Sequence, residues 1–184
     1  MDIKKTLTDA YNLYYSGQYK ESLKLYYKIL SENLDNSVSY YSIGLVYDVL
    51  GEYEMSAAYY KKSIALDSGN VRSLNNLARI YIDVIKDFDI AKTYLEQAIN
   101  YAPQDAEAYN LYGNLWILNN DYKLAINYFK KSILLDEKYF KNYYDIGLAY
   151  WGLKDKDNAI INVKKSLELN PQFTQANNLL QELL

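Results

Sequence analysis

The sequence predicts an all-α protein built from five helix–turn–helix hairpins and one closing helix. Two observations support this fold class. A pattern of apolar and small residues recurs about every 34 residues, and within each unit the apolar residues follow helical spacing. Turn-forming residues then divide each unit into two halves. We expect a single domain over residues 1–184, with repeats at about 3–36, 37–70, 71–105, 106–139 and 140–173 and a capping helix at 174–184.

The first repeat, which begins near Ile3, is the faintest copy. Thr6 stands where the later copies carry a bulky residue, as expected of an end repeat with no neighbour before it. The rest of its pattern is in register, and consists of Ala10, Leu13, Gly17, Tyr19, Ser22, Tyr26 and Ile29.

Repeats two to five share one pattern of small residues in both halves. The first halves carry Gly44, Ala78, Gly113 and Gly147 at equivalent positions. The second halves carry Ser56, Ala91, Ala125 and Ala159. Small residues at two facing positions allow the helices of a hairpin to approach closely, while larger side chains around them interlock.

Two segments depart from the regular pattern. The third repeat is one residue longer, because Tyr81 to Ala91 spans ten positions where Tyr47 to Ser56 spans nine. We expect the extra residue in the turn at 85–87, as a bulge or a longer loop. The last segment, TQANNLLQELL, begins a sixth copy and stops after one helix. Its leucines form a stripe that we expect to cover the second helix of repeat five, and they are Leu179, Leu180, Leu183 and Leu184.

The composition excludes several classes of function. With no Cys and no His, the chain has no disulfide, no thiolate nucleophile, no Cys/His zinc site and no Ser–His pair. A net charge of −3 gives no overall attraction to nucleic acid. No phosphate-binding glycine loop and no apolar run long enough for a signal peptide or membrane span is found. We therefore expect no enzyme activity, no cofactor and no metal, and take a cytoplasmic location as the default.

The period and these residues resemble the tetratricopeptide repeat family, from about Ile3 to Phe173. The resemblance implies a right-handed α-solenoid in which the first helix of each hairpin lines a concave groove. It also implies a scaffold or adaptor that binds a protein or peptide partner in that groove.

Nine groove-facing residues follow from the resemblance as candidate peptide contacts. They are Tyr11, Tyr15, Tyr41, Asn75, Arg79, Asn110, Asn114, Tyr144 and Trp151. Tyrosine and tryptophan offer large rigid surfaces with a polar tip. Asparagine can donate to and accept from a peptide backbone, and Arg79 could hold a carboxylate.

Other interpretations stay open. Most of the 23 tyrosines fall at interlocking positions and are expected in the core. A row of lysine pairs on the second helices could face an acidic partner or simply be solvated, and comprises Lys61, Lys62, Lys130, Lys131, Lys164 and Lys165. The chain could instead be a regulatory or targeting domain of a larger enzyme. It could also be a structural module that self-associates through its C-terminal helix. The closing leucines leave two explanations: the natural chain continues past Leu184, or that edge contacts another molecule.

Overall fold

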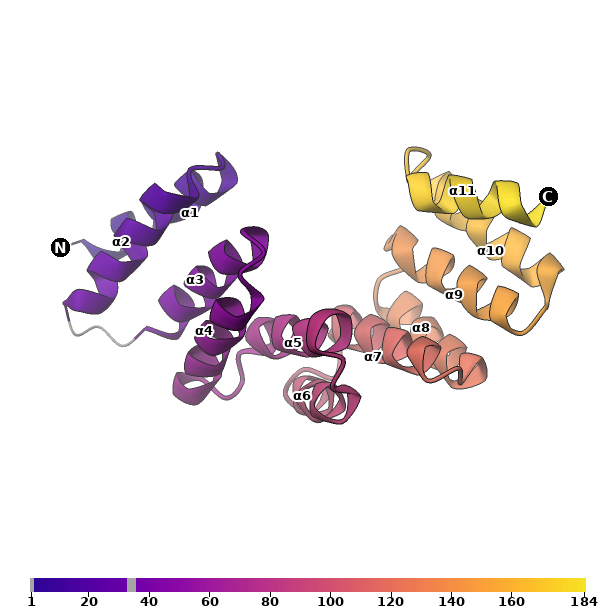
Figure 1. Ribbon diagram of the computed structural model, residues 1–184, viewed down its shortest axis with the longest axis horizontal. Coiled ribbons are helices and arrows are strands. Elements are labelled where there is room, and N and C mark those ends of the chain that lie inside the picture. Colours follow the sequence, from indigo (N-terminus) through magenta and orange to yellow (C-terminus); the bar gives the residue numbers. More distant parts are fainter. Residues whose placement is uncertain (1, 33–35) are drawn as a thin grey trace. The chain divides into compact units, whose positions relative to one another are not determined.

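The computed structural model describes residues 2–32 and 36–184, so the end of the first predicted repeat, at 33–35, lies outside the described residues. Within those ranges the chain forms eleven α-helices, one π-helical turn and no strands. The helices are α1 (Ile3–Tyr15), α2 (Tyr19–Ser31), α3 (Ser37–Val49), α4 (Tyr53–Leu66), α5 (Val71–Ile80), α6 (Phe88–Tyr101), α7 (Ala106–Leu118), α8 (Tyr122–Leu135), α9 (Phe140–Gly152), α10 (Lys156–Leu169) and α11 (Thr174–Leu183). The predicted all-α arrangement of paired helices is confirmed (Figure 1).

The helices form two compact units, unit 1 (residues 1–94) and unit 2 (residues 95–184). Unit 1 contains the hairpins α1–α2 and α3–α4, followed by α5 and the start of α6. Unit 2 contains the rest of α6, the hairpins α7–α8 and α9–α10, and α11. The first helix of a hairpin supplies the candidate site residues in both units.

Short polar side chains start most of the helices. Asn36 accepts a hydrogen bond from the backbone N–H of Ser39 at 3.0 Å, and Asp121 accepts one from Leu124 at 3.1 Å. Such N-caps satisfy backbone donors that have no partner inside the helix. These helices therefore begin where the sequence places Asn or Asp at the helix start, whereas α2, α4, α9 and α11 begin without a side-chain cap.

The turn inside each hairpin has one repeated geometry, in which one of the first two residues past the first helix has a positive φ. Five equivalent residues adopt this left-handed conformation, namely Gly17, Gly51, Lys86, Asn120 and Lys154. In the second hairpin the N–H of Glu52 returns to the carbonyl of Tyr47 at 2.9 Å, which closes the helix end. This turn orients the second helix back along the first.

The extra residue of the third repeat lies one turn earlier than the sequence predicted. A π-helical turn spans Tyr81–Ile85, and Lys86 then takes the left-handed position with φ +62°. The closing hydrogen bond, Asp87 N–H to Tyr81 carbonyl at 3.1 Å, spans six residues where the other turns span five. The helix absorbs the insertion as a π-turn, so the loop after it keeps the length it has in the other repeats.

Lys86 is predicted to be conformationally strained, because a left-handed backbone is costly for a residue with a Cβ. We expect Lys86→Gly to raise the free energy of unfolding by about 1 kcal/mol, measured by urea denaturation. Lys92→Gly, in the interior of α6, is the matched control and should lower it by about 1 kcal/mol. Destabilisation by both changes would contradict the prediction.

The hairpins α3–α4, α7–α8 and α9–α10 each pack around a glycine on the first helix. A Cβ added to Gly44 would lie 2.6 Å from the ring of Tyr60, and one added to Gly147 would lie 2.6 Å from Cγ2 of Val163. A Cβ added to Gly113 would lie 2.4 Å from the ring of Phe129. The rings of Tyr60 and Phe129 are fully buried. These contacts confirm that small residues bring the paired helices together.

The capping helix α11 covers repeat five as expected. Ala176, Leu179 and Leu183 are buried and share one core cluster with Ala159 and Val163 of α10. Leu184 departs from the predicted stripe, because 79% of it is exposed.

Gly113→Ala should destabilise unit 2, because the new methyl group overlaps the buried ring of Phe129. We expect a loss of about 1–3 kcal/mol in the free energy of unfolding, measured by urea denaturation followed by circular dichroism. Leu118→Ala, at an exposed position of the same helix, is the control and should change it by less than about 0.5 kcal/mol. An unchanged midpoint for Gly113→Ala would show that the helices do not approach so closely.

Candidate peptide-binding surfaces

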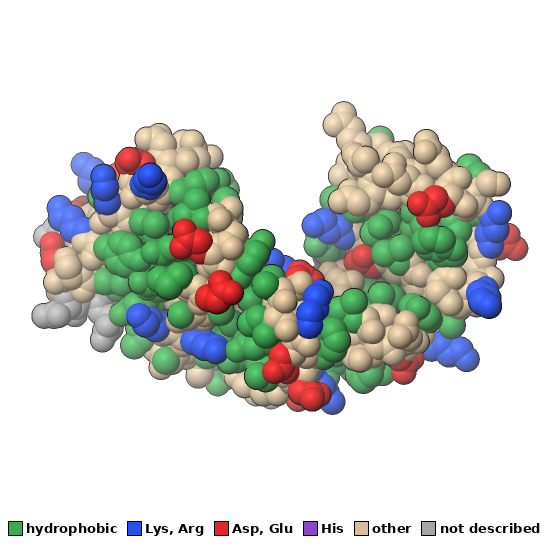
Figure 2. Space-filling model, viewed as in Figure 1, with side chains coloured by type: hydrophobic (Ala, Val, Ile, Leu, Met, Phe, Trp, Pro, Cys, Tyr) green, Lys and Arg blue, Asp and Glu red, His purple; other side chains and the backbone are tan. Residues whose placement is uncertain are grey.

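Two exposed tyrosines of α1 form an aromatic surface in unit 1. Tyr11 is 52% exposed and Tyr15 68% exposed, and their ring centroids lie 4.5 Å apart. Exposed valines on α3 add to the apolar surface of this unit, Val38 at 53% and Val49 at 49%. Figure 2 shows hydrophobic side chains gathered on one face of this unit. Tyr41 is partly buried, with its ring centroid 6.0 Å from that of Tyr60.

The polar candidates of unit 1 are engaged inside the protein. Arg79 forms an ion pair with Asp48, and the two side chains are 30% and 15% exposed. The carboxylate that Arg79 holds in this structure is therefore one of the chain's own. Asn75, one helical turn earlier on α5, is only 1% exposed. A direct contact between Asn75 and a ligand would require its side chain to move.

In unit 2, Asn110 is at the centre of a buried hydrogen-bond network and is 5% exposed. Its Nδ2 donates to Asn142 Oδ1 at 2.9 Å and to Asp145 Oδ2 at 3.0 Å, and its Oδ1 accepts from Asn114 at 3.2 Å. Asn142 in turn donates to the hydroxyl of Ser132 at 2.9 Å. The network joins three helices (α7, α8 and α9), so Asn110 holds them together rather than facing solvent.

Asp145 is the charged member of this network. It is partly buried on α9, and the loss of hydration raises the pKa of its carboxyl group to about 6, while the hydrogen bond from Asn110 and the charge of Lys141 oppose the shift. The pKa of the neighbouring Tyr139 is raised to about 12, by burial and then by the carboxylates of Glu107, Asp145 and Asp136. An acidic charge is therefore confined beside the amides of unit 2.

The aromatic candidates of unit 2 lie on α9. Tyr144 is partly buried, with its ring centroid 5.1 Å from that of Phe173. Trp151 is 44% exposed. Of the four candidates in this unit, Trp151 therefore offers the large accessible surface.

The structure thus brings the candidates together as small groups. In unit 1 it pairs Tyr11 with Tyr15, and in unit 2 it joins Asn110 to Asn114. Sequence reasoning missed Asp145, although a carboxylate stands there where the equivalent positions hold Ser42, Asn76 and Leu111. That difference between repeats was the available signal.

Several lysines of the predicted row contact side chains of their own chain. The ammonium of Lys62 lies 4.9 Å from the ring centroid of Tyr59, and that of Lys131 lies 5.4 Å from that of Tyr128. Lys61 donates to the Tyr81 hydroxyl at 2.9 Å, and Lys165 pairs with Glu168 at 2.9 Å. These contacts are cation–π, hydrogen-bond and ion-pair interactions that hold the side chains at the surface.

Within residues 2–32 and 36–184, none of the helices combines the length and apolar character that a membrane span requires.

Paired helices with this period define a helical-repeat protein. The chain belongs to the tetratricopeptide repeat family, whose sequence patterns match residues 37–70, 85–138 and 140–173. The first and last of these ranges are the ones expected for repeats two and five.

Known proteins resemble the chain over different lengths. The photosystem I assembly protein Ycf3 of Rippkaea orientalis (strain PCC 8801 / RF-1) is 32% identical in an alignment 105 residues long, which covers 48% of this chain and 61% of that protein. The match therefore spans about three fifths of that relative. The Cut9–Hcn1 hetero-tetramer of the APC/C contains a chain whose fold matches this one with a TM-score of 0.88. That match has 18% identity and covers 98% of this chain and 36% of that one. YrrB, described as a TPR protein with an unusual peptide-binding site, has a TM-score of 0.70 and 20% identity, over 94% of this chain and 89% of that one. At such identities the two structures show a shared fold.

Asp145→Asn is predicted to stabilise the protein at neutral and higher pH. The carboxyl pKa is about 6 in the folded state against an ordinary 3.8. Below about pH 4 the group is largely protonated in both the folded and the unfolded state, so it hardly changes the free energy of unfolding. As pH rises from about 4 through 6, the unfolded state ionises first and stability is lost. We expect the variant to exceed the wild type by roughly 1–3 kcal/mol at pH 8 and to match it near pH 4.

Urea denaturation at a series of pH values measures this difference. Asp157→Asn, at an exposed position of α10, is the control and should change the pH profile little. A wild type that is more stable than Asp145→Asn at pH 8 would contradict the prediction.

Proposed function

We propose that this chain is a protein-interaction scaffold that binds a segment of a partner protein through the first helices of its hairpins. The observation that carries the proposal is the exposure of large aromatic side chains on those helices: Tyr11 and Tyr15 on α1, and Trp151 on α9. Aromatic side chains dominate the energetics of protein interfaces, because they bury a large rigid area at low entropic cost. Packing within the hairpins leaves these three rings in contact with solvent.

The buried polar residues support such a surface rather than form it. Arg79 and Asp48 are held by each other, and Asn110 is fixed by Asn142 and Asp145. Side chains that are fixed before binding lose little entropy on binding. We therefore propose that the exposed aromatic residues provide anchors in each unit. Asn75 and Arg79 would shape the surface of unit 1, and Asn110 and Asn114 that of unit 2. Tyr41 and Tyr144, which are partly buried, would each border the anchors of their own unit.

The relatives support a binding role in general terms. One is named an assembly protein, one belongs to a multi-protein complex, and one is described as having a peptide-binding site. Helical repeats serve many processes, so the partner has to be found by experiment. A domain of this kind can also work inside a larger protein, and the matched chain of the Cut9–Hcn1 complex is much longer than this one.

The test is capture of a partner, followed by measurement with the purified partner. A protein retained from a lysate of the source cell by the wild-type chain would be identified and prepared, and its affinity measured by fluorescence anisotropy. We expect Tyr15→Ala and Trp151→Ala each to weaken binding by about tenfold or more, as truncation of an interface anchor does. Both side chains are exposed, so their truncation should leave the fold intact, and circular dichroism would check this.

Ile161→Ala provides the matched control, because Ile161 is 62% exposed on α10, a second helix. It should bind like the wild type. If Ile161→Ala weakens binding while the two aromatic variants do not, the interaction surface lies on the second helices and the proposal is wrong. Light scattering over a concentration series would separate partner binding from self-association, since a mass that rises with concentration favours the latter.

A further inference from the structure

The first residue of the second helix differs in repeat five. It is aromatic in the other four repeats, as Tyr19, Tyr53, Phe88 and Tyr122, and it is Lys156 in repeat five. The chain therefore replaces a ring by a flexible cation at one place in an otherwise regular series.

The aromatic residue fills space beside the first helix. In repeat one the ring of Tyr19 lies 5.8 Å, centroid to centroid, from that of Tyr14, which occupies the position equivalent to Trp151. In repeat four the ring of Tyr122 packs on α9, which is the first helix of the next repeat. A Cβ at Gly152 would lie only 2.5 Å from this ring. Without such a ring, the space beside Trp151 stays open.

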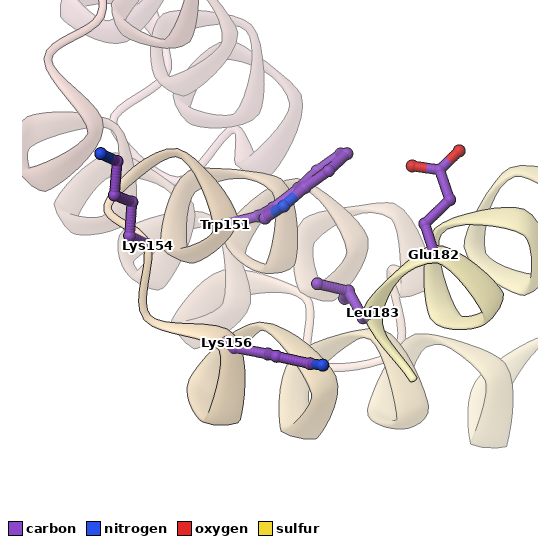
Figure 3. Close-up of a pocket in the computed structure, with 5 residues that line it drawn as sticks. All are labelled: Trp151, Lys154, Lys156, Glu182 and Leu183. Carbon is purple, nitrogen blue, oxygen red and sulfur yellow. The ribbon is translucent and has the colours of Figure 1, made fainter.

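A pocket of about 260 Å³ occupies this place in unit 2 (Figure 3). It is lined by Trp151, Lys154, Lys156, Glu182 and Leu183. Leu183 is 2% exposed and belongs to the core cluster between α10 and α11, so this wall is rigid, whereas the Trp151 side chain is 44% exposed. The volume is below the range of about 300–1,000 Å³ that is usual for small-molecule sites, and suits a single side chain.

The two lysines leave a positive charge at this pocket. The residue between them, Asp155, accepts hydrogen bonds from the backbone N–H of Asn158 at 3.2 Å and from its Nδ2 at 2.7 Å, and so caps α10. In the described part of the chain, neither Lys154 nor Lys156 has a carboxylate within ion-pair distance. The positive end of the α10 dipole adds to their charge.

Glu182 makes the charge around the pocket asymmetric. It projects from α11, whereas both lysines come from the turn and the helix start between α9 and α10 (Figure 3). A carboxylate on a ligand is attracted to the lysine side and repelled on the Glu182 side. The pocket is therefore asymmetric in charge as well as apolar at its base.

We propose that this pocket binds an apolar or aromatic side chain of a partner segment that carries an acidic residue next to it. The apolar side chain lies against Trp151 and Leu183, and the carboxylate is held by Lys156, whose side chain extends toward Leu183 (Figure 3). The inference rests on the proposed function, since it specifies the chemistry of the segment that unit 2 accepts.

Short blocked peptides test the pocket without a known partner. The probes are acetyl-Gly-Ser-Phe-Asp-Ser-Gly-amide, a second peptide with Asn in place of Asp, and a third with Ala in place of Phe. Binding is followed by NMR through the indole N–H resonance of Trp151, assigned with Trp116→Phe. We expect the Phe-Asp peptide to shift this resonance, and the Asn peptide to bind about fivefold more weakly, because exposed ion pairs contribute modestly.

Lys156→Tyr is the decisive variant, because it restores the residue type of the other four repeats. It should fill the pocket and weaken binding of the Phe-Asp peptide by about fivefold or more while the protein stays folded. Lys165→Ala, on the same helix and paired with Glu168, is the control and should bind like the wild type. Equal binding of the Asp and Asn peptides, equal binding by Lys156→Tyr, or no binding of any peptide would each overturn the proposal.

Failure here is distinguishable from failure of the scaffold function. If a captured partner binds Lys156→Tyr and the wild type equally, but loses affinity with Tyr15→Ala, the scaffold function stands and the pocket proposal falls. If the peptides behave as expected and no partner loses affinity with Tyr15→Ala, the pocket stands and the wider surface does not.

Discussion

In the hairpins α3–α4, α7–α8 and α9–α10 a glycine of the first helix meets a larger side chain of the second, and the rest of each unit depends on that contact. At Gly44 and Gly113 the facing rings, Tyr60 and Phe129, lie so close that a single added carbon would overlap them. The contact aligns one face of each first helix with its partner helix. The remaining faces are left to contact the neighbouring hairpin or the solvent, and the exposed aromatic residues lie there.

Polar groups connect one hairpin to the next within a unit. Ser63 donates to the carbonyl of Ser37 at 3.0 Å in its own hairpin and also bonds to Ser73 of α5 at 2.9 Å. Asn142 and Ser132 make the equivalent link in unit 2. Buried hydrogen bonds of this kind are costly to leave unmade, so they fix how neighbouring helices are aligned. The alignment in turn decides which candidates are exposed and which are buried.

The sequence predicted the hairpins well because their determinants are local. Small residues, turn residues and N-caps act within a few positions, and the helices begin and end where these signals stand. The sequence could not place the insertion of repeat three, because a π-turn and a longer loop are both compatible with one extra residue. Nor could it show that Asn75 and Asn110 are buried. Both lie at the border between the buried and the exposed face of a helix, so the packing of the next hairpin decides whether they are buried.

The positions that differ between repeats are informative for the same reason. A residue type shared by all copies reflects the contact that every hairpin makes, as the small residues at Gly113 and Gly147 do. A residue that appears in one copy alone has no such explanation. The raised pKa of Asp145 predicts a cost in stability at neutral pH where the other copies carry neutral residues, and Lys156 lines a pocket where they carry a ring. Positions that depart from the pattern of the other copies in this way are the places where a function specific to this chain is expected.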